Sequence, residues 1–273
     1  MRDTAARDFV YENPPLVEVI AEIHWRLVPI QIGPGTAIDP HREAFAEAFT
    51  EACAQHGFTV DETVVPDNVP RELLGHQVVR RFRRETNGWP LFQIGPGVVT
   101  ANIVPPYDGW GEFLPIVRTA VDLLFGSYPL PERYLNIEAL ELRYIDAFTE
   151  DHGVADRATF IREDLGMAAP LPEPILALAS ETDEPVQQTA SAVLQLSNPE
   201  NSIASLSVEN GTASDRPAVI ATFRARTRGN HLRRVDRDFI ATWFDEAHGV
   251  VKEWFEAAVS DRVKEKMGPT KEL

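Results

Sequence analysis

The sequence predicts an α+β protein built from duplicated antiparallel sheet units, with helices packed on the sheet. Several segments place apolar side chains at every second position, which is the period of a strand with one buried face. Other segments place them three and four positions apart, which is the period of an amphipathic helix. The same order of elements occurs twice along the chain: a strand, a helical insert, a three-strand meander and a helix.

In the first half, residues 1–13 form a polar lead-in and Pro14-Pro15 precedes the first strand, residues 16–27. One face of this strand is apolar and consists of Val17, Val19, Ala21, Ile23, Trp25 and Leu27. The other face carries Glu18, Glu22, His24 and Arg26, together with Ile20. This alternation predicts one dry and one wet face of the sheet.

A helix is expected from Asp39, a suitable N-cap residue, to Gly57, a suitable stop. Residues 58–75 contain two prolines and are expected to form a loop. Tight turns at Asn87-Gly88 and Gly95-Pro96-Gly97 then join three strands. The expected strands are 76–84, 91–94 and 98–104, and an amphipathic helix over 110–125 follows them.

The second half repeats this order. A strand over 134–148 precedes a helix near 156–165 and a proline-rich stretch. Three strands and a long helix follow, at 189–197, 203–209, 217–228 and 236–267. We therefore expect two repeats, residues 14–126 and 134–267, with a short tail at 268–273. A chance recurrence of meander and helix is the alternative explanation.

Composition excludes several classes of protein. The chain has 273 residues, 42 acidic and 26 basic, and a net charge of −16, which opposes nonspecific binding to nucleic acid. Its 44% hydrophobic content is ordinary for a globular protein with a core of its own. The sequence contains no run of 18 apolar residues that would predict a membrane span. Its N-terminus lacks the apolar core of a secretion signal. One cysteine, Cys53, agrees with a reducing compartment, so we expect a cytoplasmic protein.

The sequence resembles a sporadically distributed, uncharacterised family of bacterial and archaeal proteins. The residues that carry the resemblance are Asn13-Pro14-Pro15-Leu16-Val17-Glu18-Val19, Phe92-Gln93-Ile94-Gly95-Pro96-Gly97 and Leu142-Arg143-Tyr144-Ile145-Asp146, together with Tyr107, Trp110, Phe113 and the 247–255 part of the last helix. The family usually has Asn where this chain has Asp146, and Trp where it has Met267. The resemblance implies the length and the organisation of the chain, and it brings no assigned activity, cofactor or catalytic residue. A sporadic distribution is associated with mobile and defence-related genes.

No motif in the sequence predicts a reaction. Asp245-Glu246-Ala247-His248 matches the acidic box of some helicases, but the phosphate-binding loop that such a box needs is absent from the sequence. The tetrapeptide lies within an amphipathic helix, where His248 is expected at the edge of the core, bonded to a backbone carbonyl. The seven histidines are dispersed without ligand spacing, and a single cysteine excludes a cysteine-rich zinc site. We therefore expect neither a metal nor a cofactor.

Two arginine clusters stand out in this acidic chain. Arg80, Arg81, Arg83 and Arg84 lie in one expected strand, while Arg224, Arg226 and Arg228 alternate along another and so share a face. One interpretation is ion pairing with acidic side chains on neighbouring strands. The other is an arginine-lined groove for an anionic ligand or an acidic partner. The candidate binding residues are Arg80, Arg83, Arg224, Arg226, Arg228, Glu22, His24 and Arg143.

These observations favour a noncatalytic binding or regulatory module for a protein partner or a small anionic ligand. An alternative is an enzyme that acts on a phosphorylated or nucleotide-like substrate, with Glu22, His24 and Arg143 near the arginines. A third possibility, sequence-specific binding of nucleic acid through the arginine strands, is disfavoured by the net charge.

Overall fold

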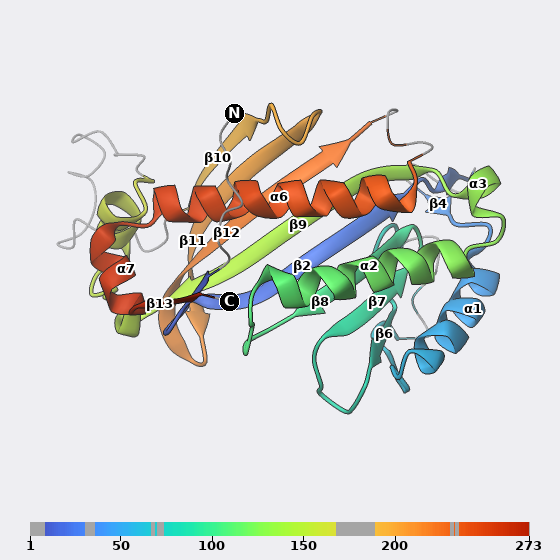
Figure 1. Cartoon of the computed structure of the whole chain (residues 1–273), viewed down its shortest axis with the longest axis horizontal. Coiled ribbons are helices and arrows are strands. Elements are labelled where there is room, and N and C mark those ends of the chain that lie inside the picture. Colours follow the sequence, from blue (N-terminus) through green and yellow to red (C-terminus); the bar gives the residue numbers. More distant parts are fainter. Residues whose placement is uncertain are drawn as a thin grey trace.

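A computed structural model gives the fold of the chain (Figure 1). The structure describes residues 9–30, 36–66, 69, 74–167, 189–229, 232 and 235–272. It confirms the predicted α+β class, with helices packed on a large antiparallel sheet.

The large sheet has nine strands in the described part of the chain, and each strand is antiparallel to its neighbours. In spatial order they are β10 (Thr189–Gln195), β11 (Ser202–Ala213), β12 (Arg216–Arg228), β9 (Ile137–Phe148), β2 (Leu16–Trp25), β8 (Val98–Ile103), β7 (Leu91–Gly95), β6 (Arg80–Arg83) and β5 (Val60–Thr63). β2 pairs with β9 at the centre, so the two halves of the chain meet there. Outward from this pair, the first half runs β2-β8-β7-β6 and the second runs β9-β12-β11-β10.

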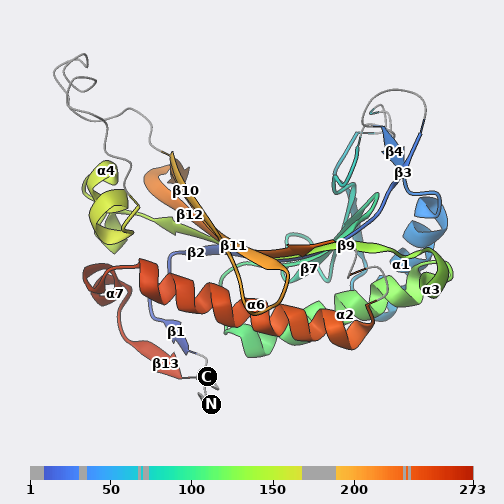
Figure 2. The same ribbon diagram turned by 90° about the horizontal axis from the view of Figure 1, so that it is seen from above.

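Helices cover one face of this sheet. α2 (Trp110–Ser127) and α6 (Arg237–Ala258) contact each other and lie side by side against the strands (Figures 1 and 2). α1 (Arg42–Gln55) packs against α2, and the short α3 (Pro131–Tyr134) leads from α2 to β9. Within the described chain, no helix combines the length and the apolar character needed to cross a membrane. The two ends of the sheet rise away from α2 and α6, so the opposite face is the inner side of a curve (Figure 2).

The core lies between the sheet and the helices. Its largest fully buried side chains are Trp25, Phe45, Phe49, Phe82, Phe92, Phe113, Phe148, Phe160, Phe223 and Phe244. Val19, Ala21, Ile23 and Trp25 are buried as the alternation in β2 predicts, but Val17 is 41% exposed. The pairing of β2 with β9 shifts by one residue between Leu16 and Glu18, and this bulge turns Val17 out of the core face.

Several elements differ from the predictions because they are short or interrupted. β5 lies in the segment expected to be a loop, and it pairs with β6. β1 (Phe9–Tyr11) pairs with β13 (Thr270–Glu272), so parts of the lead-in and the tail form a second, two-stranded sheet. β3 (Val28–Pro29) and β4 (Ala37–Ile38) form a third. Strands of two to four residues are too short to show a period in the sequence.

The expected helices at 156–165 and 236–267 are each divided. In the first of these regions a 3-10 turn, η2 (Glu150–His152), comes before α4 (Arg157–Thr159). α4 then continues directly as a π-helical turn, Phe160–Asp164. The last helix ends at Ala258, and α7 (Asp261–Met267) begins after Ser260, whose hydroxyl accepts a hydrogen bond from the Val263 backbone N–H. A side-chain N-cap at this position starts a new helix in a new direction.

Asp39 has a different role from the predicted N-cap, because α1 begins three residues later. Its buried carboxylate accepts hydrogen bonds from Trp25 Nε1 at 2.9 Å, from the Tyr128 hydroxyl at 3.0 Å and from the His41 backbone N–H at 2.9 Å. Asp39 therefore ties the end of β2 to the segment that follows α2.

We predict that Asp39→Ala lowers the free energy of unfolding by about 2–4 kcal/mol, because it leaves buried donors without an acceptor. Asp39→Asn keeps an acceptor oxygen and should cost less. Urea titration measures both changes, with Asp122→Ala as a control that removes an exposed carboxylate paired with Arg237. A loss below about 0.5 kcal/mol for Asp39→Ala would contradict this role.

Candidate functional site

The first candidate site is a charged cluster on the inner face of the sheet. Strand alternation places Glu22, Glu141, Arg143, Arg224 and Arg226 on the face opposite to α2 and α6. In the register, Glu22 lies beside Glu141 and Arg143 beside Arg224, so like charges face each other directly. Arg226 lies directly opposite Glu141, whereas Glu22 meets Arg143, and Arg224 meets Glu141, across diagonals of the sheet.

Glu141 is the centre of this cluster, and its side chain is only 6% exposed. Its carboxylate lies 3.4 Å from Arg226 Nε, 3.7 Å from Arg224 Nη1 and 3.9 Å from Arg143 Nε. One carboxylate thus lies among three guanidinium groups, and all three distances are longer than the usual N–H···O hydrogen bond of about 2.7–3.2 Å.

Glu22 forms the second acidic position. It makes an ion pair with Arg143 and lies 3.0 Å from His24 Nε2. Burial acts against ionisation of this carboxyl, but the hydrogen bond with His24 and the charge of Arg143 outweigh it and lower the pKa of Glu22. Glu22 is therefore an anion at neutral pH.

Positive charge exceeds negative charge in the cluster, with three arginines against Glu22 and Glu141. The Nε atoms of Arg143 and Arg226 are buried, and neither has a hydrogen-bond partner among the described residues. Arg224 Nε donates to Ser205 Oγ at 3.1 Å. Buried donors without partners call for a water or a ligand that would accept from them.

The structure does not bring Arg80 and Arg83 to this cluster. β6 lies four strands away from β9, which is on the order of 20 Å along the sheet. Arg80 pairs with Asp61, and Arg83 lies 3.2 Å from Glu62 and donates to the Gly88 carbonyl at 2.7 Å. These contacts are the cross-strand ion pairs of the first interpretation. Arg228 lies in β12 opposite Ala139, but its side chain is outside the described residues.

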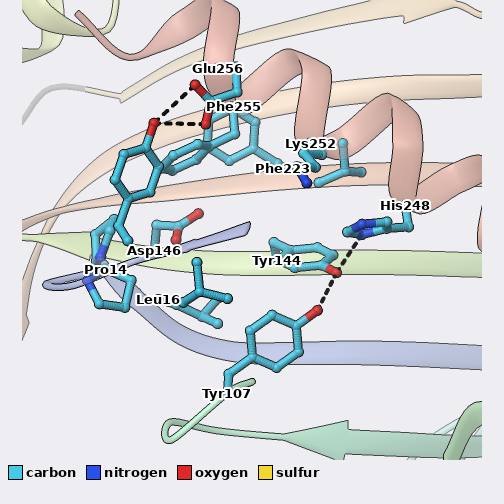
Figure 3. Close-up of a pocket in the computed structure, with 14 residues that line it drawn as sticks. Pro14, Leu16, Tyr107, Tyr144, Asp146, Phe223, His248, Lys252, Phe255 and Glu256 are labelled. Atoms are coloured by element: carbon cyan, nitrogen blue, oxygen red, sulfur yellow. Dashed lines mark hydrogen bonds between the residues drawn. The ribbon is translucent and has the colours of Figure 1, made fainter. Parts of the chain in front are cut away.

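The second candidate site is a pocket on the other face of the sheet, where α6 crosses β9 near β1 (Figure 3). It has a volume of about 100 Å³. Its walls are mainly apolar and aromatic, and they come from distant parts of the chain: Tyr11, Leu16, Tyr107, Tyr144, Phe223, Val251 and Phe255. A concave apolar site with a few polar groups is the usual form of a small-molecule site.

Asp146 is the unusual residue of this pocket. It is 3% exposed, and its Oδ2 atom has no hydrogen-bond partner among the described residues. Burial raises the pKa of Asp146 to about 8. The carboxyl is therefore largely protonated at neutral pH when the pocket is empty.

A chain of hydrogen bonds lines the wall beside Asp146 (Figure 3). The Tyr144 hydroxyl lies 2.8 Å from His248 Nδ1 and 3.1 Å from the Tyr107 hydroxyl. The His248 ring stacks on Trp110, with ring centroids 4.6 Å apart. The sequence predicted His248 at the core edge, and the hydroxyl of Tyr144 is one of its hydrogen-bond partners there.

Sequence reasoning missed this pocket, although one signal was available. In Leu142-Arg143-Tyr144-Ile145-Asp146, alternation places Asp146 on the dry face with Leu142 and Tyr144. A carboxyl on the buried face of a central strand indicates a functional position, because burying it is costly. This signal does not show which residues surround Asp146.

Within the described residues no group of acidic, histidine or cysteine side chains could hold a metal ion.

Comparison with known proteins adds no assigned function. No family model matches the chain, and no curated protein matches it. The crystal structure of the di-domain ARO/CYC StfQ from the steffimycin biosynthetic pathway shows 10% identity over 90% of this chain and 99% of that chain, with a TM-score of 0.18. A likeness this low carries no argument. These findings agree with the resemblance to a family without an assigned activity.

The raised pKa of Asp146 predicts how stability depends on pH. In the unfolded chain this carboxyl titrates near its ordinary value of about 3.9, and in the folded protein near about 8. Between these values the folded state holds a proton that the unfolded state has lost, so the contribution of Asp146 to stability falls as the pH rises. The stability of Asp146→Asn relative to the wild type should therefore increase between about pH 4 and about pH 8 and level off above that range.

Urea titration of both proteins across this range measures the effect. Asp164→Asn is the matched control, because hydrogen bonds from Arg262 and Ser260 outweigh burial and lower the pKa of Asp164. That variant should lose stability at neutral pH and show no gain as the pH rises. A pH-independent difference between Asp146→Asn and the wild type would refute the buried, unpaired carboxyl.

Proposed function

We propose that the protein is a noncatalytic binding module that holds a small anionic ligand on the inner face of its sheet, at Arg143, Arg224 and Arg226. The observation that carries the proposal is the pair of buried guanidinium Nε atoms, on Arg143 and Arg226, that have no hydrogen-bond partner in the described chain. An anion with several oxygens, such as a phosphate or a carboxylate, accepts hydrogen bonds of this kind from more than one arginine.

The local charge supports an anion in spite of the acidic chain. Three guanidiniums face two carboxylates, and each arginine side chain is about one third exposed, so it is accessible and only partly solvated. Partial removal from water strengthens the attraction of a guanidinium for an anion. Arg80 and Arg83 are not part of the proposed site, because Asp61 and Glu62 already pair with them.

An enzyme that acts on a phosphorylated substrate is the second candidate, and one contact favours it. His24 and Glu22 are hydrogen-bonded beside Arg143, as in a general base held by a carboxylate. Turnover of a phosphorylated compound that is lost in His24→Gln, with ligand binding retained, would favour the enzyme over the binding module.

The proposal also includes one expectation about the origin of the fold and one about the cellular location of the protein. The common strand order of the two halves supports an origin by duplication of one unit, with copies at residues 14–126 and 134–267. Cys53 is buried and has a free thiol, which supports a place of action in the reducing cytoplasm.

We predict opposite effects for two sets of charge changes in the cluster. Arg224→Gln/Arg226→Gln should weaken binding of inorganic phosphate, pyrophosphate or citrate at least about tenfold, because it removes two of the donors. Glu141→Gln should tighten the same binding, because it removes the carboxylate that competes for the guanidiniums. Glu141 is replaced by Gln rather than Ala because its side chain is buried among the arginines, and Gln keeps the size and the hydrogen-bonding oxygen.

Isothermal titration calorimetry of the three anions measures both changes. Arg216→Gln is the matched control, since Arg216 lies on the same strand and pairs with two exposed acids, Glu150 and Asp151. Equal anion affinity in the wild type and in Arg224→Gln/Arg226→Gln would exclude the proposed site. Capture of an acidic protein without any anion binding would favour the protein-partner alternative.

A further inference from the structure

The pocket beneath α6 contains a buried carboxyl oxygen that receives no hydrogen bond from the described part of the chain. Asp146 projects from β9 into the pocket between Leu16 and Phe223 (Figure 3). Its Oδ2 atom is buried and makes no hydrogen bond with any described residue. Such a group costs stability unless a ligand or a water satisfies it, so its presence points to something that binds there.

The walls define what could satisfy this acceptor. Five aromatic rings line the pocket, from Tyr11, Tyr107, Tyr144, Phe223 and Phe255. The faces of aromatic rings attract cations, and alkyl groups pack against the same surfaces. The pocket therefore offers an apolar enclosure with one carboxyl at its base.

The charged and titratable groups around the pocket come from three elements and one loop. β9 contributes Tyr144 and Asp146, and α6 contributes His248, Lys252 and Glu256. β1 contributes Tyr11, whose hydroxyl donates to Glu256 at 3.0 Å, and Tyr107 precedes α2. Burial, followed by the charge of Glu256, raises the pKa of Tyr11, so this phenol stays neutral. Acidic side chains outnumber the single lysine of this lining.

We propose that this pocket binds a small organic ammonium ion, with the ammonium group on Asp146 and the apolar body between the aromatic rings and Val251. An ammonium group supplies the donors that Asp146 lacks and a positive charge for its carboxylate. A carboxylate ligand would face Glu256 and, above about pH 8, the ionised Asp146 as well, and both would repel it. A metal ion would find too few ligands, since no metal-binding group occurs among the described residues.

The titration of Asp146 agrees with this occupant. Burial keeps the carboxyl protonated below about pH 8 in the empty pocket, so binding of an ammonium ion must displace a proton at neutral pH. Above that pH the carboxylate is already ionised, while an alkylamine with a pKa close to that of lysine, about 10.4, still carries its charge. Measurement near pH 9 therefore gives the clearest result.

The test compares three ligands that share one alkyl body: n-butylamine, n-butanol and butyrate. We expect n-butylamine to bind to the wild type at least about tenfold more tightly than n-butanol, and butyrate to bind most weakly. Ligand-observed NMR titration at about pH 9 detects weak binding, and contacts between the ligand methyl group and aromatic ring protons locate it. This comparison needs no variant, so it does not depend on the folding of one.

Asp146→Asn then isolates the carboxyl, since Asn has the same shape and no charge. It should reduce n-butylamine affinity at least about tenfold and leave n-butanol affinity within about twofold. Glu253→Gln is the matched control, because Glu253 is an exposed carboxylate of α6 outside the lining of the pocket, and it should change n-butylamine affinity by less than about threefold. Equal binding of n-butylamine and n-butanol, unchanged n-butylamine binding in Asp146→Asn, or no binding of n-butylamine at tens of millimolar would each overturn the proposal.

This inference is independent of the proposed anion site. Asp146 and Tyr144 face the helices, whereas Glu141 and Arg143 face the other side of the same strand. Arg224→Gln/Arg226→Gln should therefore leave n-butylamine binding unchanged, and Asp146→Asn should leave phosphate binding unchanged. Failure of one site would not imply failure of the other.

Discussion

The antiparallel pairing of β2 with β9 is the constraint on which the rest of the structure depends. It joins two halves of the chain into one sheet, and it fixes which residues of β9 lie opposite those of β2. Because side chains alternate along a strand, a slip of one residue would exchange the two faces. The helix-facing Asp146 and the inward-facing Arg143 hold their positions only in this register.

The two candidate sites show what a buried carboxylate requires. On the inner face, Glu141 is surrounded by three guanidiniums, and Glu22 has Arg143 and His24 as partners that lower its pKa. On the helix-covered face, Asp146 has no such partner among the residues that the structure describes, and burial raises its pKa. The same type of group is thus an anion on one side of β9 and a neutral acid on the other. Its neighbours, rather than its own chemistry, decide which form it takes.

The pocket around Asp146 exists because segments far apart in sequence converge on α6. β1 pairs with β13, and this small sheet brings Tyr11 to Glu256. The segment before α2 brings Tyr107 to Tyr144, and α6 itself brings His248. Each contact joins residues at least 37 positions apart, so none is visible as a local motif. The division of the last helix at Ser260 directs the chain from α6 toward β13.

The sequence alone determined the α+β class, the order of the long strands and helices and the two-faced character of β2, because apolar periodicity reports which side of an element is buried. It also located both arginine clusters, but strand order in space decided that Arg224 and Arg226 meet Glu141 beside Arg143 while Arg80 and Arg83 do not. The short strands, the bulge at Val17, the three bonds of Asp39 and the walls around Asp146 followed only from the tertiary structure. Their causes are contacts between distant segments, and a periodic pattern carries no information about which distant segment will be the neighbour.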